Sequence, residues 1–320
     1  MITWSSDFAL ERLAGPGERR DRAGTRTGFA DLDEIQSIEA GLYVAGGASG
    51  VGTTTLMHQM AEQMAEAGGH VLYATFEQRQ ADLFMKSVTR RIFMKIFGER
   101  GQPDKAFSNA EIRSGRAIGT PEAAEAVEAL KAAFGDRMAV MQGLPGQSAD
   151  DIRAGVRTYE ERIGHKPIVL IDSLELMAPS SAASGCRPDL DEARTLVARD
   201  LRIFQEELGL PVFVLVHLER RDGEADLAGF DAAGGIQRAA DVVWALQPCS
   251  VHGDARALAR EDVRRRMAGA AGQDHEVRAV ELACLRNRFG AGGYEVRFEY
   301  RPAYDAFLPV GTAAAITVNA

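Results

Sequence analysis

Residues 47–54 read Gly47-Ala48-Ser49-Gly50-Val51-Gly52-Thr53-Thr54, and they set what the rest of the chain is expected to form. They match the phosphate-binding pattern G-x-x-x-x-G-K-S/T at every fixed position except one, because Thr53 replaces the lysine. The glycines let backbone N–H groups turn toward phosphate oxygens, and a following helix adds its positive end. The pattern predicts a nucleotide-binding loop that lacks the ammonium group normally found at the β- and γ-phosphates.

The flanking sequence supports this interpretation. The apolar run 41–45 is typical of a buried strand, and residues 55–66 are typical of a helix with Leu56, Met60 and Met64 near one face. Strand, glycine loop and helix in this order are the context that the motif requires, whereas an ordinary glycine-rich turn is the alternative. The residues expected to bind the nucleotide are Gly47, Ser49, Gly50, Val51, Gly52, Thr53, Thr54 and Thr55.

The composition indicates a globular protein. With 320 residues, 46% of them apolar, the chain can bury the core of one large domain or two small ones. The formal net charge of −9 argues against a surface that coats DNA non-specifically. This net charge does not exclude a local basic stripe, such as one that lines the channel of a ring. The apolar runs are too short to span a bilayer, residues 1–7 lack the form of a signal peptide, and the three cysteines form no metal or disulfide pattern. We expect a soluble, cytoplasmic protein without a membrane partner.

The chain divides into three expected parts. Residues 1–25 form an N-terminal helix and linker, residues 26–310 form the compact domain with a polar insertion at 249–278, and residues 311–320 form a tail. Within the domain, strands alternate with helices, which predicts an α/β fold: a mostly parallel sheet flanked by helices, with a C-terminal β-hairpin. Strands are expected at 41–45, 71–76, 138–142, 167–172, 211–216, 241–246, 279–285, 294–300 and 304–308. Helices are expected at 55–66, 80–97, 121–134, 148–163 and 190–208. Residues 98–118 are expected to form a loop.

Two acidic residues follow predicted strands. Asp172 ends an apolar strand whose carboxyl end should face the glycine loop, where a carboxylate and the Thr54 hydroxyl suit a Mg²⁺ ion and its waters. Glu77 also ends a strand, and from there it could orient or deprotonate the water that attacks a phosphate. Helix N-capping is the alternative for either acid. Because both accompany the loop, we favour the catalytic interpretation.

His217 and a pair of arginines complete the candidate site. His217 ends the predicted strand 211–216, where a role as a γ-phosphate sensor and that of an ordinary hydrogen-bonded histidine both stay open. Arg286 and Arg288 lie two residues apart after a strand, so their side chains share one face. Two guanidinium groups on one edge suit phosphate binding, in this chain or in a neighbouring subunit. A charged surface at a strand end is the alternative.

The ordered set of motifs resembles the RecA-like ATPase domain of DnaB-type replicative helicases. The resemblance spans roughly residues 26–310, and RadA-type recombination ATPases are similar as well, because residues 286–290 nearly spell their lysine-Asn-Arg-Phe-Gly motif. The motifs that carry it are Thr27-Gly28-Phe29-Ala30-Asp31-Leu32-Asp33, the glycine loop, Phe76-Glu77, the Asp172 strand, His217, Asp241-Val242-Val243 and Arg286-Asn287-Arg288-Phe289-Gly290.

The resemblance implies a ring of identical subunits, commonly a hexamer, with ATP and Mg²⁺ between subunits and single-stranded DNA in the central channel. Replication or recombination proteins would be its other partners. By position, Glu77 would be the catalytic glutamate and Asp172 the Mg²⁺-linked acid. Arg288 would be the arginine finger, and Arg286 would take the place of the family's lysine. DNA contacts would come from segments 178–189 and 219–235 and their surroundings, through Arg187, Arg220, Arg221 and Arg238. Acidic residues interrupt these arginines, which predicts modest, salt-dependent DNA binding.

The departures from the family pattern leave the activity open. Thr53 replaces the loop lysine, His217 stands where the family usually has glutamine, and Arg286 where it has lysine. Neither the separate N-terminal domain of the helicases nor the zinc-binding cysteines of RadA is expected. Three hypotheses therefore remain: a DNA-stimulated ring ATPase, a nucleotide-binding scaffold or helicase partner without hydrolysis, and a regulatory ATPase that acts on proteins. Arg286, Lys86 or a cation of an adjacent subunit could substitute for the lysine, and the sequence does not choose among them.

Overall fold

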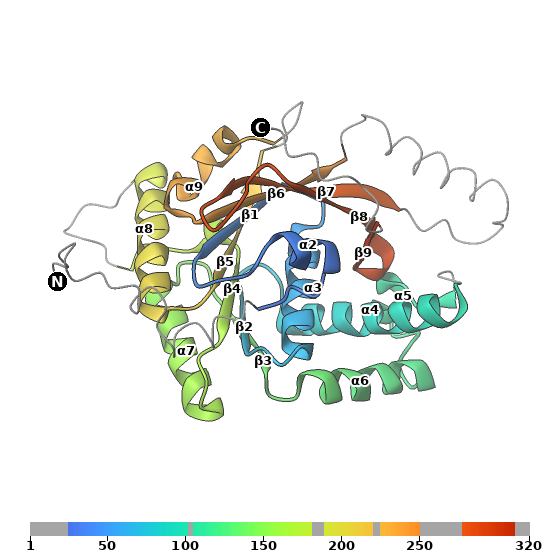
Figure 1. Cartoon of the computed structure of the whole chain (residues 1–320). Coiled ribbons are helices and arrows are strands. Elements are labelled where there is room, and N and C mark those ends of the chain that lie inside the picture. Colours follow the sequence, from blue (N-terminus) through green and yellow to red (C-terminus); the bar gives the residue numbers. More distant parts are fainter. Residues whose placement is uncertain (1–24, 102–104, 181–188, 220–224, 250–276, 311–320) are drawn as a thin grey trace, which may run out of the picture.

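The computed structural model describes residues 25–101, 105–180, 189–219, 225–249 and 277–310 (Figure 1). The expected N-terminal helix and linker, most of the polar insertion and the C-terminal tail lie outside these residues, and so do Arg187, Arg220 and Arg221. The proposed domain boundaries therefore stay predictions.

The described strands form one nine-stranded sheet in the order β3-β2-β4-β5-β1-β6-β7-β8-β9. The first six strands of this order are parallel, and β7, β8 and β9 are antiparallel. Every residue of β2 and β4 is buried, as expected for parallel strands covered on both faces. The strands are β1 Leu42–Ala48, β2 Val71–Thr75, β3 Met138–Gln142, β4 Ile168–Asp172, β5 Val212–Leu218, β6 Val242–Pro248, β7 Arg278–Asn287, β8 Glu295–Arg301 and β9 Ala306–Pro309.

Helices cover both faces of the sheet (Figure 1). One face packs against α3, with α4 and α6 beside it, and the opposite face packs against α7 and α8. The α-helices are α2 Ala30–Ile35, α3 Thr53–Glu66, α4 Gln80–Arg100, α5 Asn109–Arg113, α6 Pro121–Phe134, α7 Ala149–Ile163, α8 Leu190–Leu208 and α9 Ile236–Ala239. Short 3-10 helices lie at Leu174–Leu176 (η3), Leu227–Ala233 (η4) and Pro302–Tyr304 (η5). None of the described helices is both long and apolar enough to cross a membrane.

The central strand β1 contributes to two separate cores. Tyr43 and Ala45 belong to the cluster beneath α3, whereas Leu42 and Val44 belong to the cluster beneath α7 and α8. This alternation follows from the two-residue period of a strand. Tyr43 stacks on Phe213 of β5 with ring centroids 4.7 Å apart, which joins neighbouring strands on the α3 side.

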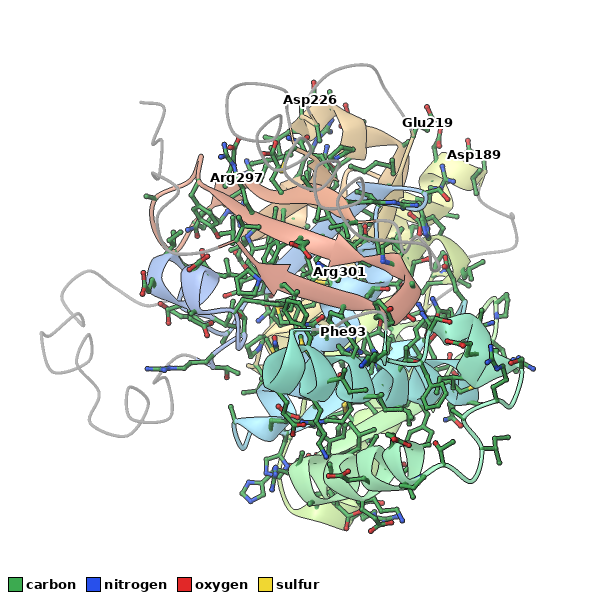
Figure 2. The ribbon with its side chains drawn as sticks, turned by 90° about the vertical axis from the view of Figure 1, so that its right-hand side faces the viewer. Phe93, Asp189, Glu219, Asp226, Arg297 and Arg301 are labelled. Carbon is green, nitrogen blue, oxygen red and sulfur yellow. The ribbon has the colours of Figure 1, made fainter. Side chains whose placement is uncertain are left out.

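The C-terminal strands are fixed to α4. Phe93 of α4 stacks on Tyr304 at 4.6 Å, and the guanidinium carbon of Arg301 lies 5.8 Å from the centroid of the Phe93 ring (Figure 2). Arg90 strengthens this attachment, because it pairs with Glu62 of α3 at 3.0 Å and donates to the backbone carbonyl of Asp305 at 2.7 Å. Helix α3 is therefore held between α4 and the C-terminal strands.

The sequence-based fold is confirmed: the sheet is mostly parallel, helices flank it, and antiparallel strands end the domain. Helices 121–134 and 190–208 and strand 138–142 have the expected bounds. The expectation of a loop over 98–118 was wrong, because α4 continues to Arg100 and α5 lies at Asn109–Arg113. Helix α5 begins with a capping box, in which the Ser108 and Glu111 side chains bond to each other's backbone N–H.

Replacing Leu201 by alanine tests the core beneath α8. Leu201 is fully buried, so Leu201→Ala should lower the free energy of unfolding by about 2–5 kcal/mol through lost burial and a residual cavity. Ile203 on the same helix is 39% exposed, and Ile203→Ala should cost about 1 kcal/mol or less. Denaturant unfolding of both variants measures the difference, and equal losses would contradict this packing.

Candidate nucleotide site

The glycine loop connects β1 to α3 in a form that requires its glycines. Gly50 and Gly52 have φ angles of +84° and +103°, which side chains rarely adopt. A Cβ atom on Gly47 would lie 2.3 Å from Thr53 Oγ1, so no larger residue fits there. Helix α3 begins at Thr53, two residues earlier than expected, and its N-cap Gly52 has no side chain to cap the first turn. The N–H groups at the start of this 14-residue helix suit an anion.

Asp172 lies at the end of β4 and contacts the loop directly. The Thr54 hydroxyl donates to Asp172 Oδ1 at 3.3 Å, and the Tyr73 hydroxyl donates to Oδ2 at 3.0 Å. Burial, together with the nearby charge of Glu77, raises the pKa of Asp172 from 3.8 to about 6. A hydroxyl next to a buried carboxylate, beside an anion site, fits the oxygen ligands that Mg²⁺ prefers, directly or through water.

Glu77, Glu175 and His217 form a second group beside Asp172. The Ser173 hydroxyl, next in the chain to Asp172, donates to Glu77 Oε1 at 2.7 Å. His217 Nδ1 lies 3.4 Å from Glu77 Oε1 and 3.4 Å from Glu175 Oε2, and the His217 backbone N–H donates to Glu175 Oε1 at 2.7 Å. The candidate catalytic glutamate therefore shares a histidine with another carboxylate.

The electrostatics of this group favour a charged imidazolium. The hydrogen bond with Glu175, followed by the charge of Glu77, raises the pKa of His217 from 6.5 to about 9. Burial opposes the charged form of Glu175, but its hydrogen bonds with His217 hold the pKa of that carboxyl below its usual value. The ligand atoms of the three residues lie within 4.8 Å of one another, which would suit a metal ion. A protonated imidazole donates rather than ligates, so an ion-pair group is the better description near neutral pH.

The sequence analysis gave Glu175 no role. Its only signal is its position three residues after Asp172, on the short helix η3 that follows β4. The contact with His217 depends on β4 and β5 being neighbours in the sheet, which the local sequence does not reveal.

Arg286 and Arg288 lie far from the loop of their own chain. Strand β7 runs antiparallel to β6, so its last residues are at the sheet edge where the parallel strands begin. Arg286 donates to the carbonyl oxygen of Gln237 at 2.8 Å. Arg288 donates to Asp241 Oδ1 at 3.2 Å and to the carbonyl oxygen of Arg238 at 3.3 Å. The two arginines share one side, as expected, but at the sheet edge opposite the loop.

Asp241 is the shared partner at that edge. Its Oδ2 accepts from Arg202 at 2.7 Å and from the Leu42 backbone N–H at 2.9 Å, while Arg288 occupies Oδ1. Asp241 is nearly buried, whereas 47% of the Arg288 side chain is exposed. Arg288 can therefore dissociate from the Asp241 carboxylate without leaving it unpaired, because Arg202 stays bound to the other oxygen.

Of the arginines expected to contact DNA, Arg238 lies within the described residues. It is exposed, 3.5 Å from Asp231, at the same edge as Arg288. The described residues at or near the borders of the segments 181–188 and 220–224 include Asp189, Glu219 and Asp226, labelled in Figure 2. Two of these acids cap helices, because Asp189 accepts from the Glu192 N–H and Asp226 from the Gly229 N–H. A DNA-binding role for these segments stays a prediction.

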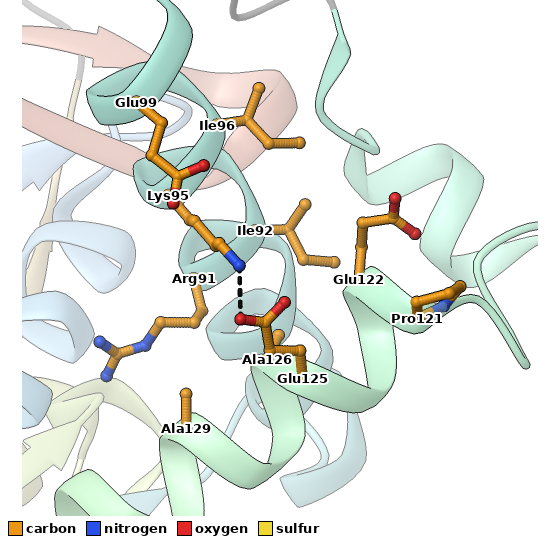
Figure 3. A pocket seen from close by; sticks show the side chains of 10 residues that line it. All are labelled: Arg91, Ile92, Lys95, Ile96, Glu99, Pro121, Glu122, Glu125, Ala126 and Ala129. Carbon is orange, nitrogen blue, oxygen red and sulfur yellow. Dashed lines mark hydrogen bonds and ion pairs between the residues drawn. The ribbon is translucent and has the colours of Figure 1, made fainter.

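A separate pocket between α4 and α6 does not belong to this site. It has a volume of about 220 Å³ and is crossed by an ion pair between Lys95 and Glu125 (Figure 3). None of the residues that line it belongs to the loop, β4 or β5. Its small size and its ion pair give no reason to assign it a ligand.

A family model described as the DnaB-like helicase C terminal domain matches residues 24–308. The chain belongs to this family. The resemblance recognised in the motifs is thereby confirmed. The glycine loop of this DnaB-like chain has Thr53 in place of the lysine, as described above.

Solved structures share the fold. One, described as an ATPase domain, is 18% identical, with a TM-score of 0.71, over 97% of this chain and 100% of that chain. A second, described as a DnaB-like replicative helicase and its interactions with primase, is 18% identical, with a TM-score of 0.70, over 97% of this chain and 68% of that chain. At this identity the likeness concerns the fold alone. No curated protein sequence gives a significant match.

The pKa of His217 provides a direct test of the ion-pair group. By NMR titration, the His217 imidazole should titrate near pH 9, and Glu175→Gln should move the pKa back toward 6.5. Because the folded state holds this proton between pH 6.5 and 9, its contribution to stability is complete below 6.5 and is lost as the pH rises through 9. The half-exposed imidazole limits that contribution to about 1 kcal/mol or less. A pKa unaffected by Glu175→Gln would contradict the contact.

Proposed function

We propose that this DnaB-like chain is a ring-forming ATPase that acts on single-stranded DNA as a helicase or translocase, in replication or recombination. The observation that supports it most is the 3.3 Å contact between Thr54 and Asp172 at the end of a glycine loop, with Glu77 beside it. A phosphate-binding loop, a metal-ligating pair and a carboxylate base are the groups that phosphoryl transfer to water requires.

The residues present fit ATP with Mg²⁺. The N–H groups of the loop and of the first turn of α3 would bind the phosphates, and Thr54 with Asp172 would hold the ion. When bound, Mg²⁺ would offset the charge that develops on the phosphate oxygens. Glu77, held by Ser173 and His217, would accept a proton from the attacking water.

Arg288 would act on the site of a neighbouring subunit. Its position at the sheet edge opposite the loop rules it out for the loop of its own chain, and its side chain is half-exposed. A head-to-tail ring brings two different surfaces of the same chain together, so the edge with Arg288 can meet the edge with the loop. Arg288 would then exchange Asp241 for a phosphate oxygen, which is the role of an arginine finger.

The missing lysine sets an expectation for the rate. Two unit charges about 4 Å apart interact by roughly 4 kcal/mol at an effective dielectric constant near 20. Without compensation, this loss would slow phosphoryl transfer by a few powers of ten, at about 1.4 kcal/mol per tenfold change. If no other cation replaces the lysine, slow but measurable hydrolysis is therefore expected.

A nucleotide-binding scaffold without hydrolysis is the second candidate function. The observation that favours it is the contact of Glu77 with a protonated His217, because a carboxylate in an ion pair is a weaker base. Together with Thr53, this contact would leave a site that binds ATP but turns it over poorly.

ATP hydrolysis separates the two functions. For the purified protein, with ring assembly verified by analytical ultracentrifugation, single-stranded DNA should stimulate phosphate release, and Glu77→Gln should abolish it. Removing the carboxylate base typically costs about 10²- to 10⁴-fold in rate. Turnover equal to that of Glu77→Gln, in verified rings, would favour the scaffold.

Mixing two inactive variants tests whether Arg288 acts between subunits. Arg288→Ala and Glu77→Gln should each lose activity, but in randomly mixed rings about a quarter of the interfaces combine an intact Glu77 with an intact Arg288. Phosphate release should therefore recover partly on mixing. Mixtures no more active than the separate variants, despite subunit exchange, would contradict this arrangement.

A further inference from the structure

Two cationic side chains among the described residues donate hydrogen bonds to the stretch 47–55. Lys86 Nζ lies 3.5 Å from Thr55 Oγ1, and a terminal nitrogen of Arg278 donates to the carbonyl oxygen of Gly50 at 2.6 Å. Either one is close enough to the loop to be considered as a replacement for the lysine that Thr53 removes.

Lys86 is engaged elsewhere. Its Nζ lies 3.1 Å from Asp305 Oδ1, and both side chains are largely buried. The Thr55 hydroxyl also donates to Asp305 Oδ1, at 3.0 Å, whereas the preceding Thr54 turns to Asp172. Lys86 therefore neutralises a buried carboxylate on the Asp305 side of α3, away from the side where Thr54 and Asp172 meet.

Arg278 lies at the rim of the loop itself. It is the first residue of β7, paired in register with Tyr300 of β8, and its guanidinium carbon is 6.0 Å from the centroid of the Tyr300 ring. The same ring packs against the loop, because a Cβ atom on Gly52 would lie 2.8 Å from it. The aromatic ring thus supports both the loop and the guanidinium group.

The space around Gly50 is open to the guanidinium group of Arg278. The φ angle of Gly50 is +84°, and a Cβ atom built on it would meet no described atom within 4 Å. The loop is therefore open at Gly50, and the guanidinium group reaches its carbonyl oxygen there. A guanidinium group has five N–H donors in a planar fork, so a bond to one carbonyl is compatible with further bonds to phosphate oxygens.

We propose that Arg278 supplies the positive charge at the nucleotide phosphates that the loop lacks at Thr53. The proposal rests on the proposed function only in requiring that the loop binds a nucleoside di- or triphosphate. The Gly50 carbonyl and the Tyr300 ring hold the guanidinium group at the mouth of the loop, where it binds phosphate oxygens. The charge comes from β7, far along the chain, instead of from the first turn of α3.

Nucleotide affinity tests this assignment. Titration calorimetry with ADP and with a non-hydrolysable ATP analogue, both with Mg²⁺, compares the full chain with Arg278→Gln and Arg278→Lys. Arg278→Gln should weaken binding of the ATP analogue at least about tenfold, as expected for a lost charge-assisted phosphate contact. Arg278→Lys, which keeps the charge but not the fork, should lie between. Arg162→Gln removes an exposed arginine of α7 and should have no effect.

A second background makes the test specific. In Thr53→Lys, which restores the loop lysine, Arg278→Gln should change affinity by less than about threefold, because the lysine then supplies the charge. An equally large loss in both backgrounds would mean that Arg278 only supports the loop, and it would overturn the proposal. This comparison also distinguishes a lost charge from a folding defect of Arg278→Gln, because a lysine at position 53 would not repair a damaged loop.

The outcomes separate this assignment from the proposed function. If the unmodified chain binds neither nucleotide, both the proposed function and the role of Arg278 are overturned. If it binds both nucleotides and Arg278→Gln binds them equally well, with an unchanged melting temperature, only the role of Arg278 is overturned. A selective loss in Arg278→Gln that Thr53→Lys rescues supports it, whether or not the chain hydrolyses ATP.

Discussion

The buried carboxylate of Asp172 is the constraint on which the candidate site depends. Burying a charge without partners is costly, so its two oxygens must be satisfied by Tyr73 of β2 and Thr54 of α3. These bonds fix the end of β4 relative to β2 and to the helix that carries the loop. Because Ser173 follows directly and holds Glu77, the position of the candidate base derives from the same carboxylate.

Much of the fold follows from local sequence, but the connections within the site do not. The Thr120 cap and the Pro121 start fix α6, and uninterrupted apolar runs fix β2 and β4. The short helix α5 escaped prediction, because its capping box acts over only five residues. Strand spacing gave the shared side of Arg286 and Arg288, yet the antiparallel direction of β7, which moves them away from the loop, depends on non-local pairing. The contacts of Glu175 with His217 and of Arg278 with Gly50 join distant segments in the same way.

Cationic side chains from other elements lie near the loop, which carries none of its own. His217 is held protonated between two carboxylates on one side, and Arg278 lies on the Gly50 carbonyl on the other. Lys86 and Arg90 surround Asp305 behind α3. A P-loop lysine supplies its charge from within the local motif, whereas here the charges depend on β5 packing beside β1 and on β7 packing beside β6. The electrostatics of this site are therefore a property of the assembled sheet.

Strand β1 also constrains how the chain can fold during synthesis. Its neighbours are β5 and β6, and Leu42 pairs with Val212, about 170 residues further along the chain. At roughly 5–20 residues per second, the apolar strand waits on the order of ten seconds or more before either partner leaves the ribosome. Such long-range parallel pairing is slow, and it leaves an unpaired hydrophobic edge open to aggregation. The strand that carries the loop is thus among the first elements made and among the last to be completed, which makes its folding dependent on protection of the nascent chain.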